Sequence, residues 1–172
     1  GRMAAEKNYD LLFQCYAAMR QANPRLRFVL AGDGPLRESM IKAHPECHFA
    51  GFYSRDEIGR HYASADIYIH PSLTETFGNV LTEAMASGLA VAGFNYAAAR
   101  QFIRDRDNGL VVPVDQPDAL VAASVELALD ENLRAQSRGA ARRCFETQSW
   151  THVIGRFEND LLAAAKLRQT HE

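Results

Sequence analysis

Apolar residues follow two alternating patterns along this chain, one with the spacing of a helix and one with the run length of a strand. From Asn8 to Ala22 they recur every three to four residues, which is typical of an amphipathic helix, at Leu11, Leu12, Cys15, Tyr16 and Met19. Asn23-Pro24 ends this pattern, since the residue before a proline disfavours helix. The apolar run from Leu26 to Ala31 then predicts a strand.

The alternation continues to the end of the chain. Ser54-Arg55-Asp56-Glu57 has the form of a capping box that opens a helix, and Gly88 is placed to end another. Further strands are predicted near His48 to Ala50, Asp66 to His70, Leu89 to Gly93 and Leu110 to Val112, and further helices at Pro35 to Ala43, Asn79 to Ser87, around Arg100, Pro117 to Leu129, Glu131 to Phe145 and Thr151 to Leu167.

This order of elements predicts an α/β fold with a three-layer α/β/α, doubly wound parallel sheet of the Rossmann-like kind. Five strands are recognisable, and a sixth that precedes Gly1 in a longer parent protein would complete the six-stranded arrangement. The start at Gly1-Arg2-Met3 leads us to expect a piece of a longer gene product. The length of 172 residues fits one domain, which we place at residues 1–172.

Charge and cysteine content narrow the classes of partner. A formal net charge of -2 gives no electrostatic basis for binding a polyanion, so we expect no nucleic acid partner. Cys15, Cys47 and Cys144 lack the spacing of a zinc site or a disulfide framework, which favours a reducing cytoplasm. No apolar run reaches the roughly 20 residues of a membrane span.

Ligands of an open parallel sheet bind beyond the carboxyl ends of its strands, so the residues that follow each strand matter most. Among these, the segment after the strand at Asp66 to His70 is the most informative. Glu75 lies in the loop, Gly78-Asn79 opens the next helix, and Glu83 lies about one turn further on. Free backbone N–H groups and the helix dipole favour a diphosphate there, and ionised carboxylates accept hydrogen bonds from sugar hydroxyls.

Arg2 and Lys7 follow the presumed upstream strand and would place positive charge on a leaving diphosphate. No aspartate cluster has metal-holding geometry, so we expect no metal site and no cofactor. Taken alone, each motif has a simpler explanation. A Glu-x7-Glu pair occurs by chance on charged helices, Gly32-Asp33-Gly34-Pro35 is a common tight turn, and the repeat of arginines is typical of a solvated face rather than of lipid contact, at Arg134, Arg138 and Arg142.

Together the motifs resemble the C-terminal, donor-binding domain of family-four (group 1) retaining GT-B glycosyltransferases. The resemblance spans nearly the whole chain and follows the family's order. It is carried by Gly1-Arg2-Met3-Ala4-Ala5-Glu6-Lys7-Asn8, Ala31-Gly32-Asp33-Gly34-Pro35-Leu36, the Glu-x7-Glu segment from Glu75 to Gly88, and Asn108-Gly109-Leu110-Val111-Val112-Pro113.

The resemblance implies roles for individual residues. Arg2 and Lys7 would grip the diphosphate, Glu75 would contact the transferred sugar, and these three form the implied catalytic set. Glu83 would hold the ribose, while Gly32 and Gly34 leave room beside the nucleotide and Phe52 flanks the base. The implied donor-binding set is Gly32, Gly34, Phe52, Thr76, Phe77, Gly78, Asn79 and Glu83.

One segment departs from the family. Many members have a Gly-Gly turn followed by Glu after the strand at Val91, where this chain has Asn95-Tyr96-Ala97-Ala98-Ala99-Arg100. The usual role of the turn therefore does not transfer. The variant resembles a subgroup that includes mannosyltransferases, and the donor stays open between GDP- and UDP-linked sugars.

We therefore expect retaining glycosyl transfer from a nucleotide-diphosphate sugar to an acceptor hydroxyl, with this chain supplying donor binding only. The expected partners are the nucleotide sugar and a missing N-terminal acceptor-binding domain, on which residues 149–172 would pack, with peripheral membrane association of the parent left open. The alternative is a non-catalytic nucleotide-binding or regulatory module on a flavodoxin-like fold. A sugar-nucleotide epimerase or a phosphorylase of the same architecture is a second enzyme interpretation.

Overall fold

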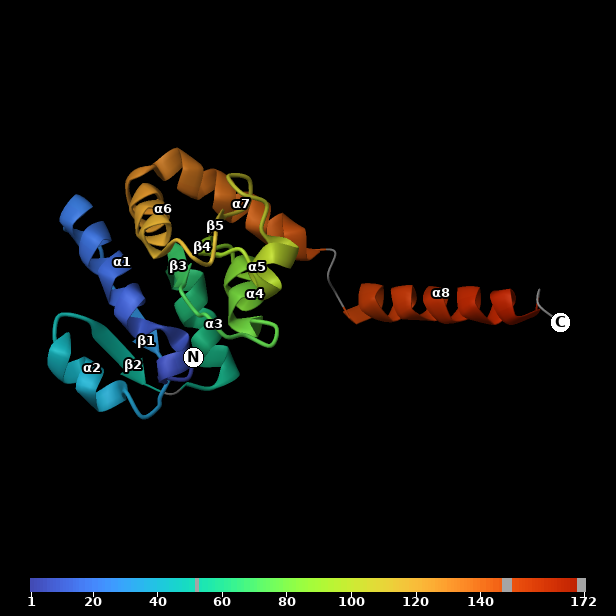
Figure 1. Ribbon diagram of the computed structural model, residues 1–172, viewed down its shortest axis with the longest axis horizontal. Helices are drawn as coiled ribbons and strands as arrows, with labels where there is room; N and C mark the ends of the chain where they lie inside the picture. Colours follow the sequence, from blue (N-terminus) through green and yellow to red (C-terminus); the bar gives the residue numbers. More distant parts are fainter. Residues whose placement is uncertain (52, 147–149, 170–172) are drawn as a thin grey trace.

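The computed structural model describes residues 1–51, 53–146 and 150–169, which form helices and parallel strands in alternation (Figure 1). The strands are β1 (Val29–Ala31), β2 (His48–Gly51), β3 (Ile67–His70), β4 (Ala90–Phe94) and β5 (Leu110–Val112). The helices are η1 (Ala5–Lys7), α1 (Tyr9–Ala22), α2 (Arg37–Ala43), α3 (Arg55–Ser64), α4 (Asn79–Ala86), α5 (Ala97–Phe102), α6 (Pro117–Leu129), α7 (Glu131–Glu146) and α8 (Trp150–Gln169).

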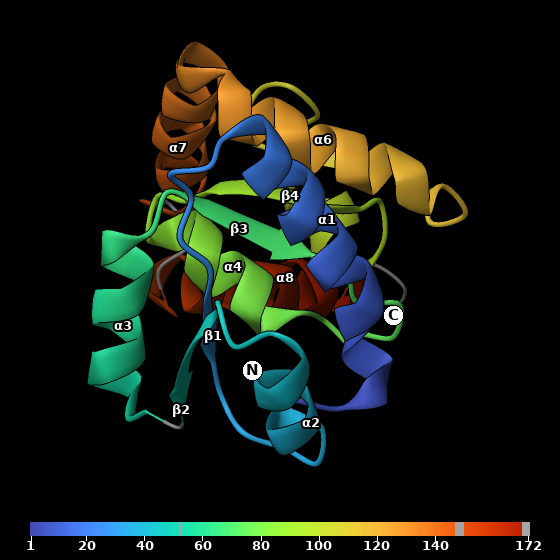
Figure 2. The ribbon, with the colours of Figure 1, turned by 90° about the vertical axis from the view of Figure 1, so that its left-hand side faces the viewer.

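The strands form two hydrogen-bonded groups instead of one continuous sheet. Strand β1 pairs in parallel with β2, and β4 lies between β3 and β5 in a second parallel group. Figure 2 shows β1 and β2 set apart from β3 and β4. The α/β class with parallel strands is confirmed, and the break between β1 and β3 is a feature that the sequence pattern did not predict.

Strand β4 shows why the domain has three layers. All five of its residues are buried, as expected for a central parallel strand covered on both faces. Ala90, Ala92 and Phe94 pack with α1 and α6 on one face, in the cluster that contains Leu11, Cys15, Met19, Leu120 and Leu127. On the other face Val91 packs with α4, α5 and α7, in the cluster that contains Leu81, Met85, Ala99 and Ala141. Figure 1 shows α1 and α6 on one side of these strands and α4 and α7 on the other.

A third, smaller core lies beneath β1 and β2. It joins the first residues of the chain to α1 and α2, because Met3, which is fully buried, packs there with Phe13, Tyr16, Leu30, Met40 and Cys47. The N-terminal segment is therefore part of the fold before the first helix begins.

Local signals set most helix ends as predicted. Ser54 and Glu57 form the predicted capping box, and Gly88 follows α4 with a φ of 79°, a left-handed conformation that glycine adopts without strain. Strand β1 begins at Val29, later than the predicted Leu26, because the Leu26 N–H closes a turn onto the Asn23 carbonyl.

Arg134 and Arg138 hold α7 against the domain, whereas Arg142 of the same repeat is exposed. Arg134 donates to the carbonyls of Leu127 and Ala128 at the end of α6. Arg138 donates to the Gly88 carbonyl and forms an ion pair with Asp66 at 2.6 Å. Two of the three arginines of the predicted repeat are therefore tied to structural partners, where the sequence predicted a solvated face.

Helix α8 extends away from the other helices in Figure 1. Its large apolar residues are exposed at Val153, Ile154, Phe157, Leu161 and Leu162. No helix among the described residues is long and apolar enough to cross a membrane. The packing of residues 149–172 on a second domain stays a prediction.

Two leucines of α6 test whether the α1/α6 face carries the stability of the domain. Leu120 is fully buried and Leu129 is 59% exposed. We expect Leu120→Ala to lower the free energy of unfolding by about 2–5 kcal/mol, since it removes buried apolar contacts and leaves a cavity. The control Leu129→Ala is expected to change it by less than about 0.5 kcal/mol. Urea denaturation followed by circular dichroism measures both, and equal effects would contradict the assignment of this core.

Candidate functional site

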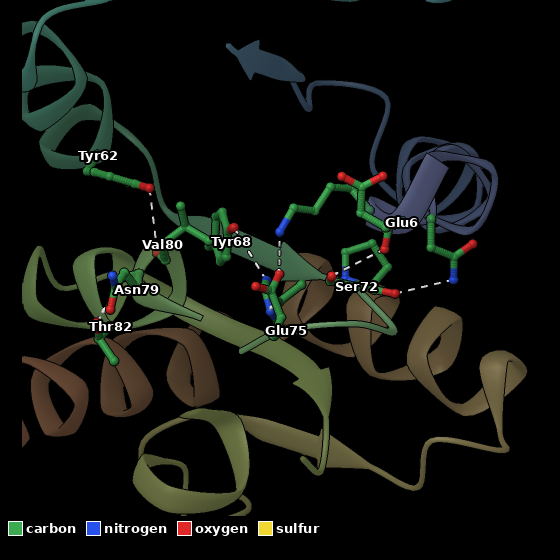
Figure 3. Close-up of polar contacts among 12 residues, drawn as sticks. Glu6, Tyr62, Tyr68, Ser72, Glu75, Asn79, Val80 and Thr82 are labelled. Atoms are coloured by element: carbon green, nitrogen blue, oxygen red, sulfur yellow. Dashed lines mark hydrogen bonds and ion pairs between the residues drawn. The ribbon is translucent and has the colours of Figure 1, made fainter. Parts of the chain in front are cut away.

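The loop after β3 is joined to the N-terminal segment at the carboxyl end of the strands. Pro71 and Ser72 are buried at the start of this loop. The Asn8 side chain donates to the Pro71 carbonyl at 3.2 Å, and the Ser72 hydroxyl donates to the Glu6 carbonyl at 3.4 Å. Figure 3 shows both contacts bridging the two segments. Residues more than 60 positions apart are thus held side by side.

Lys7 and Glu75 form an ion pair across the same junction (Figure 3). The Lys7 Nζ lies 2.6 Å from Glu75 Oε1, and the Glu75 side chain is only 10% exposed. Burial raises the pKa of Glu75, but hydrogen bonds from Lys7 and Ser72 and the Lys7 charge hold it below its usual value. Glu75 is therefore ionised at neutral pH and can accept hydrogen bonds from hydroxyl groups.

His70, the last residue of β3, lies behind this pair. Its Nε2 is 3.7 Å from Glu75 Oε1, and its Nδ1 is 3.5 Å from the Tyr68 hydroxyl. The side chain is buried beside Gly93 and Gly78. Burial lowers the pKa of His70 to about 4, so the imidazole is neutral at pH 7. A neutral ring beside Glu75 leaves Lys7 as the cation that neutralises the carboxylate.

The N-terminal end of helix α4 lies next to His70 and Glu75. Gly78 is its N-cap residue with a φ of 98°, and no side chain caps the helix. The first N–H groups of a helix lack intrahelical partners and carry the positive end of its dipole. Thr76, Phe77 and Asn79 are exposed around this end. The segment can therefore receive an anion without displacing a side chain of its own.

Glu83 lies one turn into α4 and is exposed. Burial raises the pKa of Tyr62 to about 12, and the negative charge of Glu83 adds to this shift. Burial and Lys7 lower the pKa of the Gly1 ammonium, and Glu83 opposes that lowering. Glu83 is thus close enough to Tyr62 and Gly1 for its charge to reach both.

A cavity of about 710 Å³ brings several of the charged residues together. Arg2, Lys7, His70 and Glu75 line one end of it, and Glu83 is outside the lining. Arg2 is held loosely, since its side chain is 72% exposed and lies 3.9 Å from Glu6. The structure therefore gathers three of the four charged residues singled out in the sequence, while the roles assigned to all four stay predictions.

Gly32 and Gly34 have a structural reason for lacking a side chain. A Cβ at Gly32 would overlap the carbonyl of Gly1, and a Cβ at Gly34 would lie 2.7 Å from the Met3 nitrogen. The two glycines make room for the N-terminal backbone, and a contact with a nucleotide stays a prediction. Phe52 lies outside the described residues.

The segment from Asn95 to Arg100, which differs from the family's usual sequence, contacts the site through its backbone. The Ala98 N–H donates to the Phe77 carbonyl at 2.9 Å, which ties the start of α5 to the residue before Gly78. Ala97 has a φ of 47°, a left-handed conformation that glycine adopts more easily. The start of α5 therefore has a strained backbone directly beside the loop that leads into α4.

Several residues of this site had only weak signals in the sequence. No motif assigns a role to His70, Asn8, Ser72 or Tyr68, although Ser72 is 1% exposed. For His70 and Ser72 the available signal was their position at the end of β3, and Asn8 and Tyr68 had no such signal. No group of three or more metal-ligating side chains occurs among the described residues.

Known proteins related to this chain identify its family. The family described as glycosyl transferases group 1 matches residues 1–143. A GDP-mannose-dependent alpha-mannosyltransferase of Mycobacterium tuberculosis is 33% identical over 162 residues, which cover 92% of this chain and 41% of that protein. The chain spans 32–41% of the length of the first curated relatives that it matches.

Solved structures show the same fold at lower identity. The C-terminal domain of a glycosyl transferase group 1 family protein (LpcC) from Francisella tularensis has a TM-score of 0.72 at 23% identity, covering 86% of this chain and 82% of that one. A mutant of TarM from S. aureus, in complex with fondaparinux, alpha-GlcNAc-glycerol and UDP, has a TM-score of 0.80 at 21% identity, covering 92% of this chain and 34% of that one. These matches show an architecture that the domain shares with both.

The low pKa of His70 predicts a loss of stability in acid. As the pH falls below 6.5, the unfolded chain binds a proton on this residue before the folded chain does, so the free energy of unfolding decreases down to about pH 4. The shift corresponds to about 3 kcal/mol over that range. Urea denaturation at pH 7, 5.5 and 4.5 is expected to show a shallower pH dependence in His70→Gln. His48→Gln, at an exposed histidine of β2, is the control and keeps the wild-type profile. The same slope in His70→Gln would overturn the prediction.

Proposed function

The chain belongs to the family of group 1 glycosyl transferases, and from this membership we propose that it is the donor-binding domain of a retaining glycosyltransferase. The proposal is that a nucleotide-diphosphate sugar binds where the N-terminal end of α4 meets the loop after β3. The partly buried Lys7–Glu75 ion pair carries the proposal, because it sets a cation and an ionised acceptor beside a helix end that no side chain caps.

The chemistry of this arrangement suits departure of a nucleoside diphosphate. Negative charge develops on the leaving diphosphate as the glycosidic bond breaks, and cations fixed nearby stabilise it. In the proposal Lys7 and Arg2 supply that charge, with the backbone N–H groups of Gly78 and Asn79. Glu75 accepts from hydroxyls of the transferred sugar and Glu83 from those of the ribose. Retention of the anomeric configuration is part of the proposal, on the basis of the family resemblance.

We propose mannose as the transferred sugar and GDP as its carrier. The support is the M. tuberculosis relative, whose name describes a GDP-mannose-dependent alpha-mannosyltransferase and which matches 92% of this chain. The acceptor site is assigned to a separate N-terminal domain, since the chain spans only part of its relatives' length. The exposed apolar residues of α8 are proposed to face that domain, and the whole enzyme to act in the cytoplasm at the membrane surface.

Thermal denaturation with GDP, UDP and ADP tests the proposed donor site. A ligand at about ten times its Kd stabilises the folded state by about 1.4 kcal/mol, a shift of several degrees in Tm for a domain of this size. We expect GDP to give the largest shift and Glu83→Ala to reduce it. The absence of a shift with every nucleotide at millimolar concentration would favour the non-catalytic module instead.

Variants of two lysines test whether GDP binding depends on Lys7 itself or only on the net positive charge of the domain. Lys7→Ala is expected to weaken GDP binding about tenfold by calorimetry, since it removes a charge that contacts the phosphates. Lys42, exposed in the last turn of α2, is the matched control. An equal loss in Lys42→Ala would show that the site does not depend on Lys7.

We further expect no glycosyl transfer from the 172-residue chain alone. The acceptor has no assigned pocket in this domain, so only the full-length protein should convert GDP-mannose with an acceptor. The check is release of GDP, measured for both forms at equal concentration. Turnover by the isolated chain would contradict the assignment of donor binding only.

A further inference from the structure

Strand β3 carries two polar rings that lie on one face of the strand. Residues i and i+2 of a strand point to the same side, so the side chains of Tyr68 and His70 lie together at the carboxyl end of β3. Their ring centroids are 5.9 Å apart, and the Tyr68 hydroxyl lies 3.5 Å from His70 Nδ1 (Figure 3). One nitrogen of the imidazole therefore has a hydroxyl partner on its own strand.

The other ring nitrogen of His70, Nε2, faces the N-terminal end of α4. It lies 3.7 Å from Glu75 Oε1. A Cβ at Gly78 would lie 3.8 Å from this nitrogen and 3.9 Å from Glu75 Cγ, so the imidazole edge and the Glu75 side chain meet at the N-cap residue of α4. His70 thus connects Tyr68 to the helix end that is proposed to receive the diphosphate.

The His70 ring is held in this place by the neighbouring strand. The residue is 5% exposed. Gly93 of β4 lies opposite His70 in the parallel register, and a Cβ at Gly93 would lie only 3.3 Å from the Cβ and the carbonyl oxygen of His70. Because Gly93 has no side chain, β4 covers the imidazole without pushing it out of the sheet. Packing therefore fixes which way the two ring nitrogens point.

The partners of the two nitrogens select one neutral tautomer. Burial lowers the pKa of His70 to about 4, so only one nitrogen carries a proton at pH 7. An ionised carboxylate only accepts hydrogen bonds, and a lone pair on Nε2 would face the negative charge of Glu75. The proton therefore belongs on Nε2, and Nδ1 accepts from the Tyr68 hydroxyl. Burial raises the pKa of Tyr68 above its usual value, so this hydroxyl keeps the proton that it donates.

Two donors of different charge thus approach the same oxygen of Glu75. The Lys7 Nζ lies 2.6 Å from Oε1, and the His70 Nε2 lies 3.7 Å from it. The second distance exceeds the roughly 2.7–3.2 Å of an N–H···O hydrogen bond. Lys7 therefore holds Oε1, and the neutral imidazole lies behind it as a second donor.

We propose that His70 is a positioning residue that keeps the Glu75 carboxylate oriented when Lys7 turns to a diphosphate. This role rests on the proposed function, in which Lys7 contacts the diphosphate and Glu75 the transferred sugar. As the phosphate charge draws Lys7 away from Oε1, the Nε2–H of His70 closes to hydrogen-bonding distance of that oxygen. A carboxylate has about four acceptor positions, so a donor on Oε1 leaves Oε2 to accept from a hydroxyl of the sugar.

A neutral donor suits this role better than a second cation. An imidazolium beside Glu75 would form an ion pair with the carboxylate and would repel Lys7 from the site. The neutral Nε2–H orients the carboxylate and leaves its charge to strengthen hydrogen bonds from sugar hydroxyls. His70 should therefore affect binding of the sugar, and not binding of the nucleoside diphosphate.

Nitrogen NMR tests the tautomer without any nucleotide. In the ¹⁵N-labelled 172-residue chain, couplings between ring protons and ring nitrogens distinguish the two neutral tautomers from the charged ring. Among the six histidines, the signals of His70 are those that disappear in His70→Gln. We expect the proton on Nε2 at pH 7. A proton on Nδ1 alone, or on both nitrogens, would overturn the proposal whether or not the chain binds a nucleotide.

Calorimetry with GDP-mannose and GDP tests the role of Nε2 in the site. The side-chain nitrogen of glutamine can take the place of Nε2, whereas that of asparagine takes the place of Nδ1. We expect His70→Asn to weaken GDP-mannose binding about tenfold, as for the loss of one hydrogen bond to a charged group, and to change GDP binding less than about twofold. His70→Gln should stay within about threefold of the wild type for both ligands, since it keeps a donor toward Glu75.

GDP is the internal control for folding of the variants, since it lacks the sugar. Equal losses of GDP and GDP-mannose binding in His70→Asn would show a merely structural role and overturn the proposal, as would unchanged binding of GDP-mannose. His48→Asn, at an exposed histidine of β2, is the matched control and should keep both affinities. A wild-type chain that binds neither ligand would overturn the proposed function itself, a result distinct from a failure confined to the His70 variants.

Discussion

The ion pair between Lys7 and Glu75 is the contact on which the arrangement of the site depends. It joins the N-terminal segment to the loop after β3, where two neutral hydrogen bonds at 3.2 and 3.4 Å also link the two segments. A carboxylate that is only 10% exposed stays ionised because a cation lies 2.6 Å away. The same pair keeps an acceptor and a positive charge beside the uncapped end of α4. One contact thus serves both the fold and the proposed binding of a diphosphate.

The parallel strands explain why residues far apart in the sequence meet at the site. Parallel strands place all their carboxyl ends at one edge, so the loop after β3, the turn after β1 and the start of α5 are neighbours there. Gly32 and Gly34 let the backbone of Gly1 and Met3 cross this edge closely. The Phe77 carbonyl, bonded to the Ala98 N–H, connects the helix end to the segment that departs from the family. The site is therefore built mainly by close approach of backbone segments and by one partly buried ion pair.

Helix periodicity, caps and turns predicted most elements, because these signals are local. The capping box at Ser54 and the left-handed Gly88 lie as expected. A motif marked Glu75 and Gly78 in the sequence, and their roles in binding stay predictions. His70, Ser72 and Asn8 were harder to recognise, since a single polar residue beside a strand end has the same appearance whether it faces solvent or a partner that is distant in sequence. The α7 arginines show the same limit, because their acceptors lie on other elements.

The sequence by itself determined the alternation of strands and helices, the α/β class and the family, since these depend on periodicity and on motifs a few residues long. Only the tertiary structure decided that β1 and β3 stand apart, that burial lowers the pKa of His70, and that Arg2 is left exposed while Lys7 is paired. The reason is physical. Burial, charge pairing and strand adjacency are properties of surfaces that meet in space, and no local stretch of residues encodes which surfaces those are.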